Sequence, residues 1–266
     1  MNGRDEIKIV TPDMRVESGL FDDVLSANIS VLVFRGYIPP VMSQDLVSDL
    51  EHCSKLIRVS SYLNAKLTTL GPYFVKYISS PEEYFKQVAE IQAVLPGSLD
   101  VMKDNVYRLV REWLQFETFK TAVDPVFGEY SGSIVRFHAD GIANPLHNDN
   151  ISRDAACSGL VVANIVHQLS CVVCLQECTA GGALRVFKKK WNFDDERFKN
   201  KCELGYSDDV VSGYGFCEFS PCRGDIYIFN PGYYHEIDCV SGVTRITLGF
   251  FFGIAGGDVK TAIAWS

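Results

Sequence analysis

The spacing of apolar residues changes character near residue 125 of the chain. In the first part, the clearest pattern is helical and lies in LDVMKDNVYRLVREWLQF, residues 99–116, where apolar side chains recur at intervals of three and four. The apolar face comprises Leu99, Met102, Val106, Leu109, Val110 and Trp113. This pattern predicts a helix that buries one side against a core.

Two further helices are predicted in the same part of the chain. One is VMSQDLVSDLEHCSKL, which Pro39-Pro40 precede. The other begins at Ser80-Pro81-Glu82-Glu83, which combines a capping serine, a proline at the first helical position and acidic residues in the first turn. We therefore expect residues 1–125 to form a mostly helical support region.

Beyond Asp124-Pro125 the apolar residues come in short runs. These runs are rich in Val, Ile, Phe and Tyr and are separated by turns, as in SGSIVRFHADG, HQLSCVVCLQE, GGALRVFKK, RGDIYIFNPG and TRITLGFFFGI. Such a series is typical of a β-sandwich or barrel. We therefore expect one domain over residues 1–266, mainly β with N-terminal helices (α+β), in which the helices buttress a β core at residues 126–266.

A charged segment interrupts the predicted strands at residues 188–215. Its sequence is KKKWNFDDERFKNKCELGYSDDVVSGYG. A solvated loop would account for this composition. A lid over a binding site is the alternative, because long loops in compact domains are often functional.

Composition narrows the class of partner. Hydrophobic residues make up 47% of the chain, and the formal net charge of −8 argues against a nucleic-acid partner, since nothing would neutralise phosphates. The opening MNGRDEIKIVTPDMRVE has no signal-peptide pattern, and apolar runs such as SGLVVANIVHQLSCVVCLQ are too interrupted by polar residues to span a membrane. The nine cysteines are accordingly expected to be reduced thiols of a cytoplasmic protein.

Candidate metal ligands lie in FHADGIANPLHNDN, residues 137–150. This segment contains one pattern twice, as His138-Ala139-Asp140 and as His147-Asn148-Asp149. A histidine and a carboxylate two residues apart can supply two ligands to one metal ion. The spacing alone does not distinguish the two triplets.

A third ligand is predicted later in the chain. His235 follows GDIYIF and an Asn-Pro-Gly turn, and Arg245-Ile246-Thr247 comes ten residues afterwards, with Arg245 and Thr247 on the same face of a strand. Two imidazoles and one carboxylate on one face of an octahedral Fe(II) leave positions for O₂ and for the 2-oxo acid end of a dicarboxylate cosubstrate. An arginine assisted by a threonine hydroxyl is suited to hold the far carboxylate of that cosubstrate.

These features carry a family resemblance. From about residue 130 onward, in HQLSCVVCLQECTAGGALRVFKKKWN and FSPCRGDIYIFNPGYYHEIDCVSGVTRITLGFFFGIAGGDVKTAIAWS, the chain resembles iron(II)/2-oxoglutarate-dependent oxygenases with a double-stranded β-helix. More narrowly, it is similar to the carrier-independent aliphatic halogenases and their hydroxylase relatives. The resemblance implies a jelly-roll (cupin-like) core, Fe(II), the cosubstrates 2-oxoglutarate and O₂, and a small-molecule substrate such as a free amino acid or a natural-product intermediate.

The resemblance also separates the two triplets. Members of the group carry an arginine-bearing strand, a glycine turn and then a second strand with the metal triplet. Arg136 and Gly141 match the first two places. The metal triplet is then His147-Asn148-Asp149, and His138 and Asp140 are left at the hairpin turn before it.

The implied site comprises His147, Asp149 and His235 as metal ligands, with Arg245 and Thr247 as residues that bind 2-oxoglutarate. In the halogenases of the group, a small residue at the carboxylate position leaves room for chloride. Because Asp149 fills that position, the expected reaction is hydroxylation of an unactivated C–H bond, with succinate and CO₂ formed from 2-oxoglutarate. Desaturation, cyclisation or halogenation by the same iron chemistry is the alternative, and a non-catalytic β-barrel binding protein is a third interpretation.

Several residues keep two interpretations. An ion pair with Glu236 or Asp238 would also account for Arg245. Trp191 and Tyr234 are either walls of a pocket or members of the core. Four polar residues are either contacts to a polar substrate or ordinary turn residues: Glu129, Asp140, Asn144 and Asn150.

Overall fold

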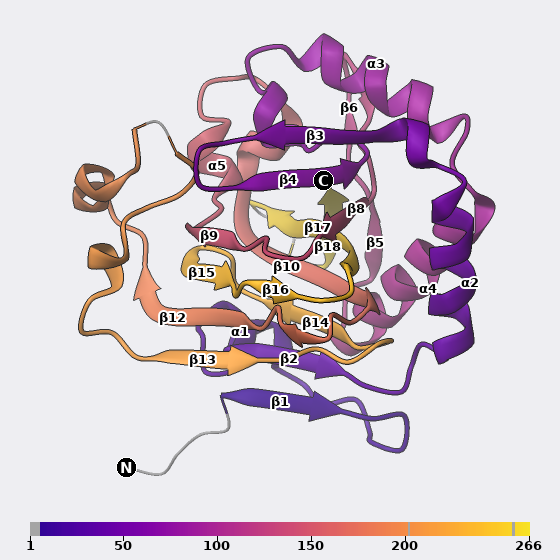
Figure 1. Ribbon diagram of the computed structural model, residues 1–266, viewed down its shortest axis with the longest axis horizontal. Coiled ribbons are helices and arrows are strands. Elements are labelled where there is room, and N and C mark those ends of the chain that lie inside the picture. The colour runs from indigo at the N-terminus through magenta and orange to yellow at the C-terminus, as the bar shows by residue number, and fades with distance from the viewer. Residues whose placement is uncertain (1–5, 202, 257–258) are drawn as a thin grey trace.

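Two β-sheets form the core of the computed structural model, which describes residues 6–201, 203–256 and 259–266 (Figure 1). The larger sheet has ten strands and the smaller sheet has four. Pairing is antiparallel throughout both sheets, except between β1 and β2 and between β18 and β5.

The strands of the larger sheet are, in spatial order, β1 (Ile7–Val10), β2 (Val31–Phe34), β14 (Ile226–Phe229), β10 (Ile165–Gln176), β17 (Arg245–Ala255), β8 (Ile134–His138), β4 (Lys66–Leu70) and β3 (Ile57–Ser61), with β18 (Thr261–Trp265) joining β17 to β5 (Thr118–Thr121). Those of the smaller sheet are β13 (Phe216–Phe219), β12 (Leu184–Lys190), β15 (Tyr233–Ile237) and β9 (Asn144–His147). Two short pairs complete the β structure, namely β6 (Val123–Asp124) with β7 (Gly128–Glu129) and β11 (Ala180–Gly181) with β16 (Val240–Ser241).

The helices belong mostly to the first half of the chain. The α-helices are α1 (Leu20–Leu25), α2 (Pro40–Glu51), α3 (Pro81–Gln92), α4 (Gly97–Trp113) and α5 (Ile151–Asp154). Short 3₁₀ helices are η1 (Ser54–Leu56), η2 (Phe74–Tyr77), η3 (Val161–Asn164), η4 (Phe193–Phe198) and η5 (Asp208–Val211). Within the described residues, no helix is both long enough and apolar enough to cross a membrane.

Helices α1, α2 and α4 cover one face of the larger sheet. Their buried side chains join those of β10, β17 and β14 in one apolar cluster, and Figure 1 shows α2 and α4 together at one side of the sheets. The apolar face predicted for residues 99–116 is the buried face of α4. The helical buttress expected on one face of the β core is therefore present.

Alternation along the strands separates this helix-covered face from the interior. On β17, Ile246, Leu248 and Phe252 belong to the helix-covered cluster, whereas Arg245 and Thr247 line a cavity on the other face. Successive strand residues point to opposite faces, so a single strand supplies both the core and the site.

The N-terminal part contains strands as well as the expected helices. β1 and β2 extend one edge of the larger sheet, and β3 and β4 extend the other. These short runs were not recognised in the sequence because helical patterns dominate that region. At the start of α3, Ser80 occupies the N-cap position as predicted. Its side chain makes no capping hydrogen bond, so it does not act as a capping serine.

The insertion, residues 188–215, is partly buried. It contains η4 and η5, and Tyr206, Val210 and Val211 pack against Leu146 and Tyr234 of the smaller sheet. Leu204 of the insertion exchanges two hydrogen bonds of 2.9 Å with the side chain of Asn64, in the turn between β3 and β4. A purely solvated loop is therefore an incomplete description of this segment.

Helix packing against the sheet predicts a stability difference within α2. Leu46 is 1% exposed and Val41 is 56% exposed. We expect Leu46→Ala to lower the free energy of unfolding by about 2–5 kcal/mol, because it leaves a cavity under the helix. The matched variant Val41→Ala should change the free energy by less than about 0.5 kcal/mol. Urea denaturation measures both, and equal effects would contradict this packing.

Candidate metal centre and its cavity

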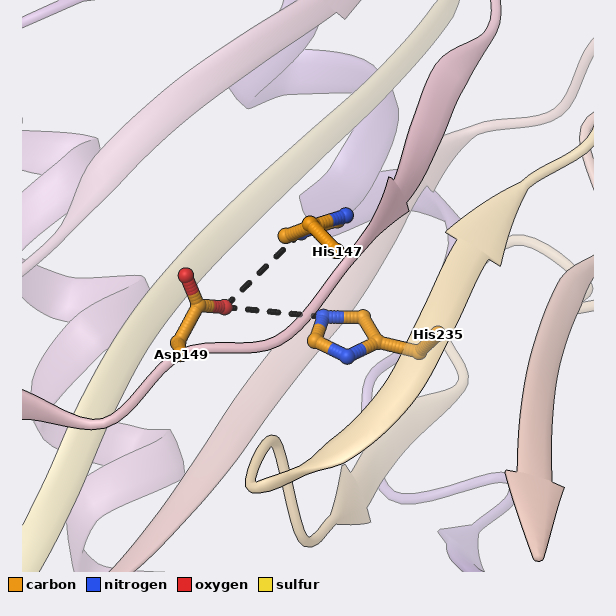
Figure 2. A group of neighbouring side chains, drawn as sticks. All are labelled: His147, Asp149 and His235. Atoms are coloured by element: carbon orange, nitrogen blue, oxygen red, sulfur yellow. Dashed lines mark ion pairs between the residues drawn. The ribbon is translucent and has the colours of Figure 1, made fainter. Parts of the chain in front are cut away.

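The smaller sheet brings the predicted metal ligands together. His147 ends β9, Asp149 follows it closely, and His235 lies in the middle of the neighbouring strand β15. The register of this antiparallel pair places His147 directly opposite His235. The three side chains point toward one another (Figure 2). One strand pairing therefore creates the cluster.

The ligand atoms lie close enough to share one ion. Asp149 Oδ2 is 3.5 Å from His235 Nε2 and 3.8 Å from His147 Nε2, and the ligand atoms of all three residues lie within 4.8 Å of one another. The amide of Asp149 donates to the carbonyl of Pro231 at 2.9 Å, which holds the backbone beside the turn before β15. A divalent ion with bonds of about 2.0–2.2 Å to nitrogen and oxygen ligands matches a cluster of this size.

Both histidines make the hydrogen bonds expected of metal ligands. Nδ1 of His147 donates to the carbonyl of Pro145 at 2.7 Å, and Nδ1 of His235 donates to the carbonyl of Tyr233 at 2.9 Å. Each bond holds the proton on Nδ1 and leaves the lone pair of Nε2 directed into the cluster.

The protonation states also suit a metal. Burial and the neighbouring His235 lower the pKa of His147 to about 4. Burial alone would raise the pKa of Asp149, but the contact with His235 and the charges of His147 and Arg136 bring it below its ordinary value. A neutral imidazole and an ionised carboxylate are the states that bind a divalent cation. Across the described residues, this is the one group of His, Cys, Asp or Glu side chains with such geometry.

The cluster opens into a cavity of about 310 Å³ that is lined by strands of both sheets. Arg245 and Thr247 lie in its wall, and their exposed fractions are 3% and 2%. The guanidinium of Arg245 donates to the hydroxyl of Tyr227 at 2.8 Å. Because that partner is neutral, the charge of this buried arginine is left for an anion in the cavity.

The alternative ion pair for Arg245 is wrong. Glu236 accepts from Arg185 at 3.2 Å and Asp238 lies 3.9 Å from the same arginine, while Arg245 has no ion pair with any described residue. Gly182 makes room for the arginine, since a Cβ at this glycine would lie 3.0 Å from Arg245 Cδ. Its φ of 69° also requires the left-handed region, which favours glycine.

The first triplet does not join the cluster. His138 ends β8 and lies opposite Arg245 in the neighbouring strand, where it is buried. Asp140 accepts a hydrogen bond of 2.7 Å from the amide of Gly242, in the turn after β16. Burial and the charges of Arg245 and Arg136 lower the pKa of His138 to about 3, so His138 is a neutral part of the cavity wall at pH 7.

A family model described as carrier-protein-independent halogenase WelO5 matches residues 7–266. The chain belongs to the WelO5 family. Among curated proteins, it is 31% identical over 101 residues to leucinostatins biosynthesis cluster protein S of Purpureocillium lilacinum, a match that covers 36% of this chain and 41% of that protein. The match thus spans about two fifths of the length of that relative.

Solved structures share the fold of this WelO5-family chain at low sequence identity. An N-substituted L-amino acid dioxygenase from Burkholderia ambifaria AMMD superposes with a TM-score of 0.58 at 13% identity, over 92% of this chain and 90% of that one. The non-heme alpha-ketoglutarate-dependent carbocyclase SnoK from nogalamycin biosynthesis gives a TM-score of 0.55 at 7% identity, over 89% and 83% of the two chains. The expected fold, a double-stranded β-helix core buttressed by helices, is confirmed.

The WelO5-family chain also contains site residues that the sequence did not reveal. Arg153 donates to the side chain of Asn148, between the two ligands of the triplet, at 2.6 Å, and to Asp154 at 2.7 Å. Its guanidinium lies 4.6 Å from the ring centroid of Trp191, and the indole of Trp191 donates to Glu196 at 3.1 Å. The insertion is therefore linked to the metal triplet through contacts that no local motif indicates.

The cavity lining distinguishes the remaining candidates for substrate contacts and for aromatic pocket walls. Asn144 lines the cavity, whereas Glu129, Asp140 and Asn150 do not. Trp191 and Tyr234 are not part of the wall either, and Tyr234 is fully buried in the cluster beneath the insertion. For these two aromatic residues, packing is the correct interpretation.

The ligand assignment of this WelO5-family chain predicts a difference between two histidine variants. We expect His147→Ala to weaken binding of Fe(II) at least about tenfold, because loss of a partner behind a ligand already costs roughly 10–100-fold. His138→Ala is the matched control and should retain the metal. Metal content after anaerobic loading and desalting measures both variants, and loss of iron only in His138→Ala would overturn the assignment.

Proposed function

We propose that this protein is an iron(II)/2-oxoglutarate-dependent oxygenase that hydroxylates an unactivated C–H bond of a small molecule. The observation that carries the proposal is the cluster of His147, Asp149 and His235, which opens into the same cavity as the buried Arg245. Membership of the WelO5 family supports it. A structural neighbour, the dioxygenase from Burkholderia ambifaria AMMD, was also solved in complex with alpha-KG.

In this proposal, Fe(II) is held by the Nε2 atoms of His147 and His235 and by the carboxylate of Asp149. Arg245 binds the far carboxylate of 2-oxoglutarate, while Tyr227 holds the guanidinium in place and Thr247 adds a hydroxyl on the same face of β17. When iron, 2-oxoglutarate and O₂ are bound, they supply oxidation of a C–H bond together with decarboxylation of 2-oxoglutarate to succinate and CO₂.

Asp149 favours hydroxylation over halogenation. Its backbone is fixed by Pro231, and its carboxylate faces both histidines, so it occupies a ligand position that chloride would otherwise take. Halogenation is the second candidate, because the matching family is described as a halogenase. Desaturation and cyclisation would use the same ligands and depend on how the substrate is placed.

We further propose that residues 1–266 act as one oxygenase domain and that the insertion covers the cavity as a lid. The hydrogen bonds between Asn64 and Leu204 support the second point, since Leu204 lines the cavity and Asn64 lies in the opposite hairpin. A cytoplasmic location accords with the described cysteines, all of which are free thiols.

The cofactor assignment predicts an optical signal. Anaerobic protein mixed with Fe(II) and 2-oxoglutarate should develop a visible metal-to-ligand charge-transfer band. In Arg245→Ala, the concentration of 2-oxoglutarate needed for half of that band should rise at least about tenfold, because a charge-assisted bidentate pair is lost. A titration followed by absorption measures this concentration. Absence of the band in the unaltered protein at all iron loadings would refute the oxygenase proposal.

If Asp149 is a metal ligand in the position of chloride, the product should be hydroxylated and not chlorinated. A compound that stimulates succinate release should gain one oxygen atom, and the yield of any chlorinated product should stay below about one part in a hundred even in high chloride, since the chloride position is filled. Succinate release across a panel of metabolites, followed by mass spectrometry, provides the measurement. Chlorine in the main product would establish the halogenase alternative instead.

A further inference from the structure

Arg136 lines the cavity as Arg245 does, but the proposed function assigns it no role. It lies on β8, where its register partners are Thr247 on β17 and Thr69 on β4. It is half-buried and lines the cavity together with Ile134. Within the described parts of the chain, its guanidinium has no hydrogen bond and no ion pair, so its donors have no protein acceptor.

Arg136 lies in the same cavity as the metal cluster. His147, Asp149, His235 and Arg136 all line this space. Tyr73 lines it as well, and its hydroxyl lies 2.8 Å from that of Tyr62. A small molecule that reaches the metal cluster therefore shares the cavity with Arg136.

The cavity is basic although the protein is acidic. Five of the lining residues are Lys or Arg and only two are Asp, whereas the whole chain carries a formal net charge of −8. One of those acids, Asp154, is paired with Arg153 at 2.7 Å, and the other is the metal ligand Asp149. Lys66 and Lys199 are exposed, and Lys199 is also paired with Glu196 at 3.6 Å. Among the described residues, the arginines of the cavity wall without an ion-pair partner are therefore Arg136 and Arg245, and their charge favours entry of anions.

The cosubstrate leaves Arg136 without an anion. In the proposed function, Arg245 binds the far carboxylate of 2-oxoglutarate, while the 2-oxo acid end and the carboxylate of Asp149 bind the iron. None of these anionic groups is assigned to Arg136. Because an unpaired charge in an enclosed site is costly, a further anion is needed to complete the site.

We propose that the substrate carries an oxyanionic group, a carboxylate or a phosphate, and that Arg136 binds it. This inference rests on the proposed function, because it takes the anionic groups of 2-oxoglutarate and Asp149 to be bound by Arg245 and iron. It narrows the substrate class to anionic small molecules. It also makes Arg136 the residue that orients the substrate, since a guanidinium binds such a group in a bidentate and directional way.

The test uses matched pairs of probes that differ in one charge. The probes are hexanoate with hexanamide and phenylacetate with phenylacetamide, and ligand-observed NMR gives their dissociation constants for protein loaded with Zn(II) and saturating 2-oxoglutarate. We expect each acid to bind at least about tenfold more tightly than its amide, as a charge-assisted pair requires. In Arg136→Gln, acid and amide should bind within about twofold of each other.

Two comparisons separate the source of the carboxylate and the effect of overall charge. In Arg136→Gln, the concentration of 2-oxoglutarate that gives half of the iron charge-transfer band should stay within about threefold of the unaltered value, whereas Arg245→Gln should raise it strongly. Arg108→Gln removes one charge from the exposed side of α4 and should leave the preference for acids intact.

Three outcomes would overturn the inference. The first is the absence of any acid preference in both probe pairs, including the absence of binding. The second is a preference that survives in Arg136→Gln, which would assign it to the metal or to another cation of the cavity wall. The third is a loss of 2-oxoglutarate binding in Arg136→Gln as large as in Arg245→Gln, which would assign Arg136 to the cosubstrate. Failure of the proposed function itself is distinct, because the unaltered protein would then show no charge-transfer band.

Discussion

The pairing of β9 with β15 is the constraint on which the metal cluster depends. It sets His147 opposite His235, and the chain leaving β9 then returns Asp149 to the same place, where its amide bonds to Pro231. A shift of the register by one residue would turn one imidazole to the other face of the smaller sheet. The insertion, packed against Leu146 of β9, adds burial that opposes such a shift.

The larger sheet contributes the cations under a similar constraint. Alternation on β17 and β8 directs Arg245 and Arg136 inward while their neighbours pack under the helices. The buried apolar layer stabilises the two strands, so the energetic cost of enclosing guanidinium groups is offset by side chains on the other face. The proposed sites for iron and for anions thus come from different sheets and meet only in the folded chain.

The sequence was informative where chemistry or periodicity is local. The face of α4, the strand runs after residue 125 and the pattern of His147, Asp149, His235, Arg245 and Thr247 all follow from spacing and residue type, with the resemblance needed to choose between two equal triplets. Helical patterns dominate the sequence before residue 71 and hide its strands. For β2 and β4 the sequence is also uninformative because their partners β14 and β8 lie far away in the chain, although β3 and β4 form a local hairpin. Separation along the chain likewise hides the contact of Arg153 with Trp191 and that of Tyr227 with Arg245.

The contacts of Arg153 have a consequence for how the protein can diverge. Asn148 lies between two metal-ligand positions, yet its hydrogen-bond partner is held by Trp191, which in turn depends on Glu196. Substitutions in the insertion therefore reach the metal centre without touching it. Exchanging this segment for that of a relative would change the contacts of Arg153, and with them the surroundings of Asn148. We therefore expect residues of the insertion and of the triplet to vary together among relatives.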